Sequence, residues 1–255
     1  MMFKLPLIYY INMEKSKNRL DHMEKNLNKY GLNYKRINAI DGLNRTEIIN
    51  YLLDSNIIKL IEHNKSILNG KTRDHRTKEI ACILSHLKAI KTAYDDNLEY
   101  VIITEDDVNF DDFLKKESEF LDAIRNLPRD WDIVQITSTN QKVIKELGQK
   151  YKRRIDFIPR VHHNDYKKWK TDGFWSNGAY LLNRKGMEKI VKNEFKDNIV
   201  NLEDTTNIFE ADHYIYKHLN AYTLTGIFIT LKLFQSTIGE KHMFEAIDSN
   251  LFSFF

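Results

Sequence analysis

The chain has 255 residues, of which 39 are basic and 36 acidic, and a net charge of +3. This near balance of charges does not favour a nucleic-acid-binding protein, so we expect no nucleic-acid partner. Three Pro, nine Gly and no internal repeat favour a single domain over residues 1–255 rather than two domains joined by a linker.

The number of cysteines and the composition of the N-terminal residues indicate the cellular compartment. The single cysteine, Cys82, excludes an internal disulfide, suits a reducing compartment and is expected to be a small buried side chain. Residues 1–10 resemble a first strand more than a signal peptide, and no segment approaches about 18 consecutive apolar residues. We therefore expect no membrane span and a cytoplasmic protein, in a bacterium or a virus-infected host cell.

The chain opens with a strand, a helix and a strand. Leu5 to Asn12 is an apolar strand, Ser16 can cap the following helix, and Gly31 ends that helix before a short strand, Tyr34 to Ile37. The apolar positions on one face of the helix are Leu20, Met23, Leu27 and Tyr30. This order is typical of a nucleotide-binding α/β fold with a Rossmann-like, mostly parallel sheet flanked by helices.

Two polar residues lie near the ends of these strands. Arg19 follows the first strand and Asp41 follows the second, in Ala39-Ile40-Asp41-Gly42. They either contact the base, ribose or phosphate of a nucleotide, or they are a surface arginine and a turn aspartate. Both interpretations remain open.

Residues 43–78 resemble an insertion. The predicted helical pieces are Thr46 to Leu53 and Ile57 to His63, followed by a polar stretch from Asn69 to Lys78. From Glu79 a helical period returns and places His86 two turns along the same face, which is otherwise apolar. Glu79 and His86 could meet a ligand or one another, or His86 could be structural.

The most informative stretch is a β-branched strand that ends in three carboxylates, Glu105, Asp106 and Asp107. Two carboxylates about 5 Å apart repel by roughly 3 kcal/mol at a dielectric near 20, so a bound divalent cation would explain the run. Mg²⁺ or Mn²⁺ suits such oxygen ligands and commonly holds a diphosphate.

The ligand pair depends on the backbone. An extended chain pairs Glu105 with Asp107, and a turn at Glu105 brings Asp106 and Asp107 together. Alternatively, the acids solvate a strand end and cap a helix that starts near Asp111.

The second half of the chain continues the alternation of strands and helices. We expect a helix from Asp111 to about Asn126, a central strand over Asp132 to Ile136, and a strand near Ile155 to Ile158. Residues 139–172 otherwise form a second insertion, a lid or an acceptor surface.

The last elements carry two more candidate regions. Gly178 and Ala179 open a strand where small residues allow either a bulky ligand or close packing, and Asn183 to Gly186 turns into the helix Met187 to Asn193. A helix starting at Glu210 and continuing through Leu219 carries Asp212. Glu210 and Asp212 are helix caps, or one is a catalytic base. A final strand is expected over Ile227 to Phe234.

These pieces together resemble glycosyltransferase family 25, which includes lipooligosaccharide galactosyltransferases and collagen hydroxylysine glycosyltransferases. Six ordered segments carry the resemblance: Tyr10-Ile11-Asn12 followed by Ser16 and Arg19; Ala39-Ile40-Asp41-Gly42; Glu79-Ile80-Ala81-Cys82-Ile83-Leu84-Ser85-His86; Ile103-Thr104-Glu105-Asp106-Asp107-Val108; Gly178-Ala179-Tyr180-Leu181; and Ala211-Asp212.

The resemblance implies a GT-A-like fold and an inverting, metal-dependent transfer of a sugar, galactose or glucose, from a UDP-sugar to a hydroxyl. The acceptor would be a glycan or a hydroxylysine-type group, lipid-linked or on a protein, as in lipopolysaccharide biosynthesis. Mn²⁺ (or Mg²⁺) would be held by Glu105, Asp106 and Asp107, and the base would be Asp212, with Glu210 second. The expected substrate contacts are Asn12, Arg19, Asp41, Glu79, Ser85, His86, Gly178 and Ala179.

Two other functions are compatible with acids at a strand end. One is a metal-dependent nucleotidyl- or phosphotransferase, although no phosphate-binding glycine loop accompanies these acids. The other is a catalytically silent domain that keeps the fold for binding. Intact carboxylates argue against the silent domain.

Overall fold

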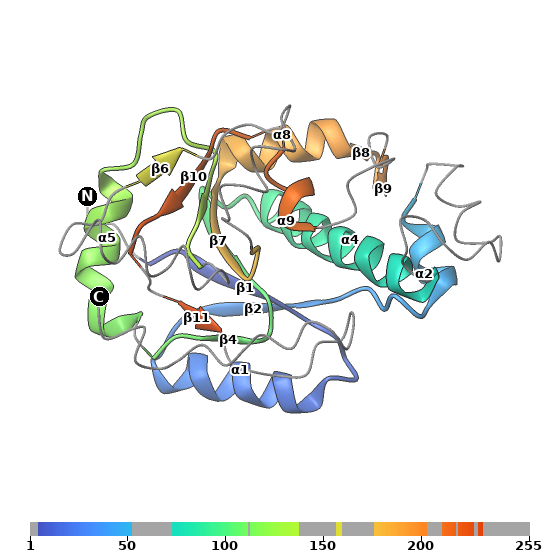
Figure 1. The fold of residues 1–255 in the computed structure, drawn as a ribbon, viewed down its shortest axis with the longest axis horizontal. Helices are drawn as coiled ribbons and strands as arrows, with labels where there is room; N and C mark the ends of the chain where they lie inside the picture. The colour runs from blue at the N-terminus through green and yellow to red at the C-terminus, as the bar shows by residue number, and fades with distance from the viewer. Residues whose placement is uncertain are drawn as a thin grey trace.

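The computed structural model describes residues 5–52, 73–111, 113–137, 157–159, 176–202, 211–217, 219–226 and 229–231. Its centre is a seven-stranded sheet in the order β2-β1-β3-β7-β5-β10-β6 (Figure 1). The strands are β1 (Leu7–Asn12), β2 (Tyr34–Asn38), β3 (Tyr100–Thr104), β5 (Ile133–Gln135), β6 (Phe157–Pro159), β7 (Ala179–Asn183) and β10 (Ala221–Leu224). Only β7 and β6 run against the other strands of this sheet. The predicted α/β, mostly parallel sheet is confirmed.

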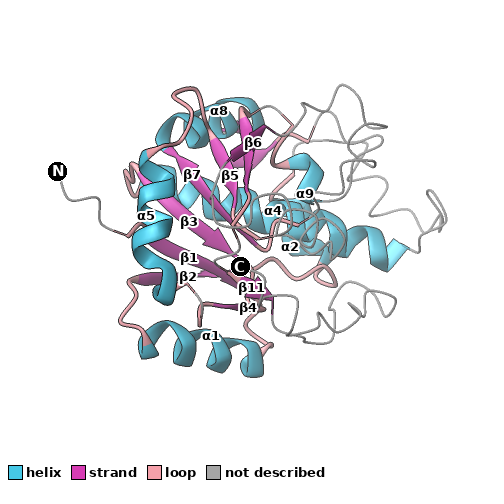
Figure 2. Ribbon diagram, turned by 60° about the vertical axis from the view of Figure 1, so that its left-hand side comes forward, coloured by secondary structure: helices cyan, strands magenta, loops and turns pink. Residues whose placement is uncertain are grey.

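Helices cover both faces of the sheet (Figure 2). α1 (Lys17–Lys29) and α5 (Glu117–Arg125) pack on one face, and α2 (Arg45–Asn50), α4 (Arg73–Asp95), α8 (Arg184–Glu194) and α9 (Ala211–Tyr214) pack on the other. Alternate residues of each strand face opposite layers: Tyr9 and Ile11 meet α4, whereas Ile8 and Tyr10 meet α1. Central strands are therefore apolar on both sides, which explains their continuous β-branched runs.

Smaller elements complete the described chain. They are the strands β4 (Val108–Asn109) and β11 (Thr230–Leu231), which pair with each other, the hairpin of β8 (Phe195–Lys196) and β9 (Ile199–Val200), and the 3-10 helix η1 (Leu114–Lys116). The β1-α1-β2 opening is as predicted, and Gly31, with φ 62°, takes the left-handed conformation after α1.

Several predicted helix boundaries were wrong. No helix starts at Asp111, because its carboxylate accepts hydrogen bonds from Tyr30 and Lys29; a 3-10 turn follows and α5 begins only at Glu117. α4 begins at Arg73, inside the stretch expected to be irregular. α9 ends at Tyr214 instead of continuing to residue 219.

α8 begins earlier than predicted, at Arg184. Asn183 caps it by accepting a hydrogen bond from the Gly186 backbone N–H at 2.7 Å. A glycine occupies this helical position because a Cβ at Gly186 would lie 2.7 Å from the carbonyl oxygen of Asp132, so a larger residue would prevent this close approach of α8 to the start of β5.

Part of the predicted insertions lies outside the described residues. Among the described residues, the first insertion contributes α2 and the start of α4, and the second contributes β6, which extends the sheet beside β10. The predicted helix Ile57 to His63, Glu210 and the end of the last strand lie outside this part. The division into one domain with two insertions stays a prediction. No helix within the described ranges has the length and apolar character that a membrane crossing requires.

The sheet brings distant segments to one edge. β1, β2 and β3 are parallel, so their carboxyl ends, at Asn12, Asn38 and Thr104, lie together. Because β7 runs antiparallel to β3, its amino end arrives at the same edge, with Ala179 opposite Thr104. In α/β sheets this edge is where ligands bind.

Candidate functional site

The three acids follow β3 where the backbone turns. The Glu105 N–H donates to the Gly178 carbonyl oxygen at 2.9 Å, which continues the β3–β7 pairing by one residue. Asp106 then points toward β1 and α1: one of its oxygens accepts from Asn12 Nδ2 at 2.7 Å and the other from Arg19 at 2.6 Å. Asn12, Arg19 and Asp106 thus form one connected group at the end of β1 and β3.

Asp107 carries the least compensated charge. Burial, followed by the charge of Glu105, raises the pKa of this carboxyl to about 8, although Arg19 at 3.5 Å lowers it. Its Oδ1 is buried and has no hydrogen-bond partner among the described residues. A buried carboxylate oxygen without a donor is destabilising unless a proton or a cation meets it, and the raised pKa is the response that a proton gives.

This acid group fits a hard divalent cation. Both Asp106 oxygens already accept hydrogen bonds, whereas Asp107 Oδ1 is unpaired and Glu105 is only partly buried. Carboxylate oxygens are the ligands that Mg²⁺ and Mn²⁺ prefer. Burial alone would lower the pKa of Arg19, but the combined attraction of Asp106, Asp107 and Glu105 outweighs it and raises that pKa.

His86 is fixed by neighbours from three segments. Its Nδ1 lies 3.0 Å from the Tyr180 hydroxyl, its Nε2 accepts a hydrogen bond from Asn177 Nδ2 at 2.8 Å, and Glu105 Oε1 lies 3.4 Å from Nε2. Glu79, for which the sequence allowed contact with a ligand or with His86, is buried on α4 and accepts a 2.8 Å hydrogen bond from Arg76 one turn earlier.

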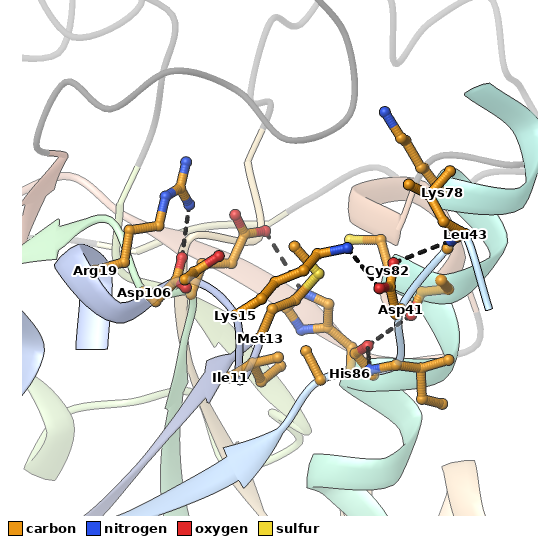
Figure 3. A pocket seen from close by; sticks show the side chains of 17 residues that line it. Ile11, Met13, Lys15, Arg19, Asp41, Leu43, Lys78, Cys82, His86 and Asp106 are labelled. Carbon is orange, nitrogen blue, oxygen red and sulfur yellow. Dashed lines mark hydrogen bonds and ion pairs between the residues drawn. The ribbon is translucent and has the colours of Figure 1, made fainter. Parts of the chain in front are cut away.

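A cavity of about 300 Å³ opens beside the acids (Figure 3). Its wall includes Asp106 and Arg19 on one side, joined by an ion pair, and Asp41 with Lys15, also paired, on another. Of the predicted site residues, Arg19, Asp41, Ser85, His86, Glu105 and Asp106 line this cavity. Its size is at the lower end of the range for small-molecule sites.

The loop after β2 shapes this cavity. The Ser85 hydroxyl accepts from the Ile40 N–H at 2.9 Å and donates to the Ala81 carbonyl at 2.6 Å, so Ser85 ties the loop to α4. A Cβ on Gly42 would lie 2.5 Å from Cα of Lys78, so only glycine permits this approach. Ser85 is therefore a wall residue that also positions Ile40 and Asp41.

The segment before β7 lies beside the end of β3, where the Gly178 carbonyl accepts the Glu105 N–H. Ser176 has φ 120°, and its N–H donates to Asp212 Oδ2 at 3.3 Å. A Cβ on Gly178 would meet Ser176 and Leu231 at 3.1 Å, and Ala179 is fully buried in the sheet. These contacts support close packing as the reason for the small residues.

Sequence reasoning missed three polar groups and misjudged one. Asn177, Tyr180 and Lys15 escaped notice because only the fold brings them to His86 and Asp41. Cys82, expected to be simply buried, is partly exposed in the cavity wall. The sequence did carry a signal for this position: Cys82 lies four residues before His86, and residues four apart share one face of a helix.

The fold and site define an α/β protein that gathers acids, bases and a cavity at the carboxyl ends of parallel strands. The family model described as Glycosyltransferase family 25 (LPS biosynthesis protein) matches residues 6–215. The chain belongs to glycosyltransferase family 25, and the predicted membership and the GT-A-like fold expected with it are confirmed.

Curated relatives agree with this family. Procollagen galactosyltransferase 2 of Homo sapiens is 26% identical over 190 residues, covering 72% of this chain and 27% of that protein. Procollagen galactosyltransferase 1 of Danio rerio is 22% identical, covering 84% and 33%, and a Glycosyltransferase 25 family member of Aedes aegypti is 24% identical, covering 81% and 31%. The chain thus spans between a quarter and a third of these relatives' length.

Among solved structures, the apo form of mouse Xyloside xylosyltransferase 1 is similar with 13% identity over 72% of this chain and 55% of that one. The TM-score of 0.30 is too low for the likeness to carry an argument.

Proposed function

We propose that this protein transfers a hexosyl group from a UDP-sugar to an acceptor hydroxyl, with inversion at the anomeric carbon and dependence on Mn²⁺ or Mg²⁺. The observation that carries the proposal is the acid group at the end of β3: Glu105 and Asp106 line the cavity, and the buried Oδ1 of Asp107 next to them has no hydrogen-bond partner among the described residues. Family membership supplies the reaction class.

Glu105 and Asp107 are the residues that would hold the cation, with Asp106 completing the acid group. Asp106 keeps its bonds to Asn12 and Arg19 and so orients the turn that presents the other two carboxylates. When bound, the divalent cation supplies charge neutralisation for the diphosphate leaving group.

Basic side chains in the same wall suit a nucleoside diphosphate. Arg19, Lys15 and Lys78 all line the cavity, and the first two are already paired with Asp106 and Asp41. A phosphate oxygen can replace the carboxylate in such an ion pair, because carboxylate and phosphate both accept charge-assisted hydrogen bonds, and an arginine can bind either one in a bidentate manner. The loop at Ile40 and Gly42, held on α4, gives the nucleoside an apolar wall.

Asp212 is the proposed general base. The acceptor oxygen forms a bond to the anomeric carbon on the face opposite the diphosphate, the bond from that carbon to the phosphate oxygen breaks, and the hydroxyl proton passes to Asp212. Two observations support Asp212: it accepts the Ser176 N–H at 3.3 Å, and its charge contributes to the raised pKa of Cys82, which lines the cavity. Glu210 remains the second choice.

The donor sugar proposed first is galactose, because two of the curated relatives are named procollagen galactosyltransferases. The acceptor is a hydroxyl of a glycan or a hydroxylysine-type group. A cytoplasmic location, suggested by cysteine usage, belongs to the same proposal.

A thermal-shift screen of UDP-, GDP- and CMP-sugars, with and without Mn²⁺, tests donor and metal together, because a ligand of the folded state raises its melting temperature. We expect UDP-galactose to raise the melting temperature (Tm) only with Mn²⁺. Product analysis should then find free UDP and transferred sugar. Transfer of the nucleotide instead, or full turnover in EDTA, would contradict the proposal.

The base has its own test. We expect Asp212→Asn to keep the UDP-induced rise in Tm while turnover falls by about 10²- to 10⁴-fold, the usual contribution of a general base. Unchanged turnover would assign the base to another residue.

A further inference from the structure

A second set of metal ligands lies in the same cavity wall, distinct in chemistry from the acid group. The Cys82 thiol, the His86 imidazole and the Glu105 carboxylate each offer a ligand atom within 4.8 Å of the other two, and all three residues line the cavity. Cys82 and His86 lie one turn apart on α4, and Glu105 faces them from the end of β3.

We propose that Cys82, His86 and Glu105 form a binding site for a borderline-soft divalent cation such as Zn²⁺. Thiolate and imidazole ligands favour Zn²⁺ and Co²⁺ over Mg²⁺ and Mn²⁺. Three protein ligands on a cavity wall leave a fourth position open to water or to an oxygen of a bound molecule.

The second ring nitrogen of His86 is held as in a metal-bound histidine. Nδ1 donates to the Tyr180 hydroxyl, which leaves the lone pair on Nε2; that lone pair accepts the Asn177 Nδ2–H in this structure, so an ion at Nε2 would replace this hydrogen bond. Metal-bound histidines usually hold their tautomer by such a bond from the second nitrogen. Tyr180 is fully buried, so the ring orientation is fixed before any ion arrives.

The distance from His86 to Glu105 also fits. Nε2 and Oε1, both lone-pair atoms, lie 3.4 Å apart. Metal–ligand bonds of about 2.0 to 2.1 Å at a tetrahedral angle place two such atoms about 3.3 Å apart. The sulfur lies within 4.8 Å of both atoms, and rotation of the Cys82 side chain can adjust it to the roughly 3.6 Å that a tetrahedral site needs.

The surrounding charge attracts a cation. Burial, then the charges of Glu105, Asp212, Asp107 and Glu79, raise the pKa of the Cys82 thiol well above its usual value. The carboxylates that hold the proton on the sulfur would equally favour a cation in its place. Binding therefore releases one proton from Cys82 as the metal–sulfur bond forms.

Glu105 belongs to both ligand sets, so the two proposed cations cannot bind independently. A Zn²⁺ ion at Cys82 and His86 occupies the carboxylate that the acid group would use for Mn²⁺, so the two cations compete. Zinc should inhibit the transferase, and this consequence alone rests on the proposed function.

Cobalt tests the site without any sugar donor. The full chain, titrated with Co²⁺ in a non-thiol reductant, should show thiolate-to-cobalt charge-transfer absorption at one ion per chain, with release of one proton. Cys82→Ser should remove this band and weaken Co²⁺ binding at least about tenfold, whereas Tyr180→Phe should keep the band and weaken binding about tenfold.

The outcomes are distinct. Absence of the band in the wild-type protein, or the same band and affinity in Cys82→Ser, would overturn the proposal. Zinc inhibition that a chelator reverses, and that needs at least about tenfold more Zn²⁺ in Cys82→Ser, would support the competition for Glu105. If no transfer is ever detected, the cobalt titration still decides the metal site, so failure of the proposed function is recognised separately.

Discussion

Replacement of Asp107 by asparagine should stabilise the metal-free protein while removing its response to Mn²⁺. In the folded protein the pKa of Asp107 is raised from 3.8 to about 8. A carboxyl whose pKa is higher in the folded state than in the unfolded state destabilises the fold once the pH exceeds the unfolded value. The free energy of unfolding of the wild type should therefore fall between about pH 4 and pH 8.

The size of this effect follows from the shift. pH 7 lies about three units above the unfolded pKa of 3.8 and about one unit below the folded pKa of about 8, so ionisation in the unfolded state lowers the stability by at most about 4 kcal/mol. Asparagine also loses the attraction of Arg19 at 3.5 Å, so we expect a net gain of roughly 1 to 3 kcal/mol. For a chain of this length that raises Tm by about 2 to 10 °C.

The assay is thermal unfolding in EDTA from about pH 4 to pH 8, repeated with Mn²⁺. Asp107→Asn should show a flatter pH dependence than the wild type and no Mn²⁺-induced rise. The matched control is Asp111→Asn, because hydrogen bonds from Tyr30 and Lys29 lower the pKa of Asp111 to about 2 and its loss should destabilise the protein. A metal-free Asp107→Asn protein that is no more stable than wild type at pH 8 would refute the reasoning.

Three further substitutions test the surroundings of the acids. Gly42→Ala places a Cβ 2.5 Å from Cα of Lys78, so it should cost about 1 to 3 kcal/mol of stability and weaken UDP-sugar binding in a thermal-shift titration. Asn12→Ala removes the 2.7 Å hydrogen bond to buried Asp106 and should cost about 1 to 3 kcal/mol in urea unfolding. Arg19→Gln removes the cation beside Asp106, so the metal-free Tm should fall and Mn²⁺ should restore it by more than in wild type.

Two comparisons show whether these effects are specific to the site. Gly31→Ala also replaces a glycine, but nothing lies within 4 Å of the added Cβ, and only the φ of 62° opposes it. It should cost about 1 kcal/mol and leave UDP-sugar binding unchanged. Equal loss of binding in Gly31→Ala and Gly42→Ala would show that the loop after β2 has no special part in the site. A smaller Mn²⁺ response in Arg19→Gln than in wild type would reject competition between Arg19 and the cation.

The central strands could be predicted because their residues are almost all apolar and many are β-branched. β1 and β3 are apolar on both faces, so no alternative element accommodates them, and the acids after Thr104 mark the strand end clearly. The helix expected at Asp111 failed because side chains of α1, distant in sequence, bind its carboxylate instead. Local capping residues could not reveal that competition.

The candidate site likewise contains residues that the sequence could predict and residues that it could not. Asn12, Arg19 and Asp106 were each predicted to belong to the site, because each lies in or just after a strand of a mostly parallel sheet, but their direct contact depends on the pairing of β1 with β3. Asn177 and Tyr180 could not be placed, because nothing in the sequence indicates that β7 inserts antiparallel between β3 and β5.

That insertion affects how the protein can form during synthesis. Until Ala179 to Asn183 leave the ribosome, the nascent chain can assemble only β2, β1 and β3 as one half of the sheet, and the outer edge of β3 stays open. The carbonyl of Gly178 that receives the Glu105 N–H arrives with the same segment. A polypeptide released before this point would carry an unpaired apolar edge, a surface that favours aggregation, and an unanchored Glu105.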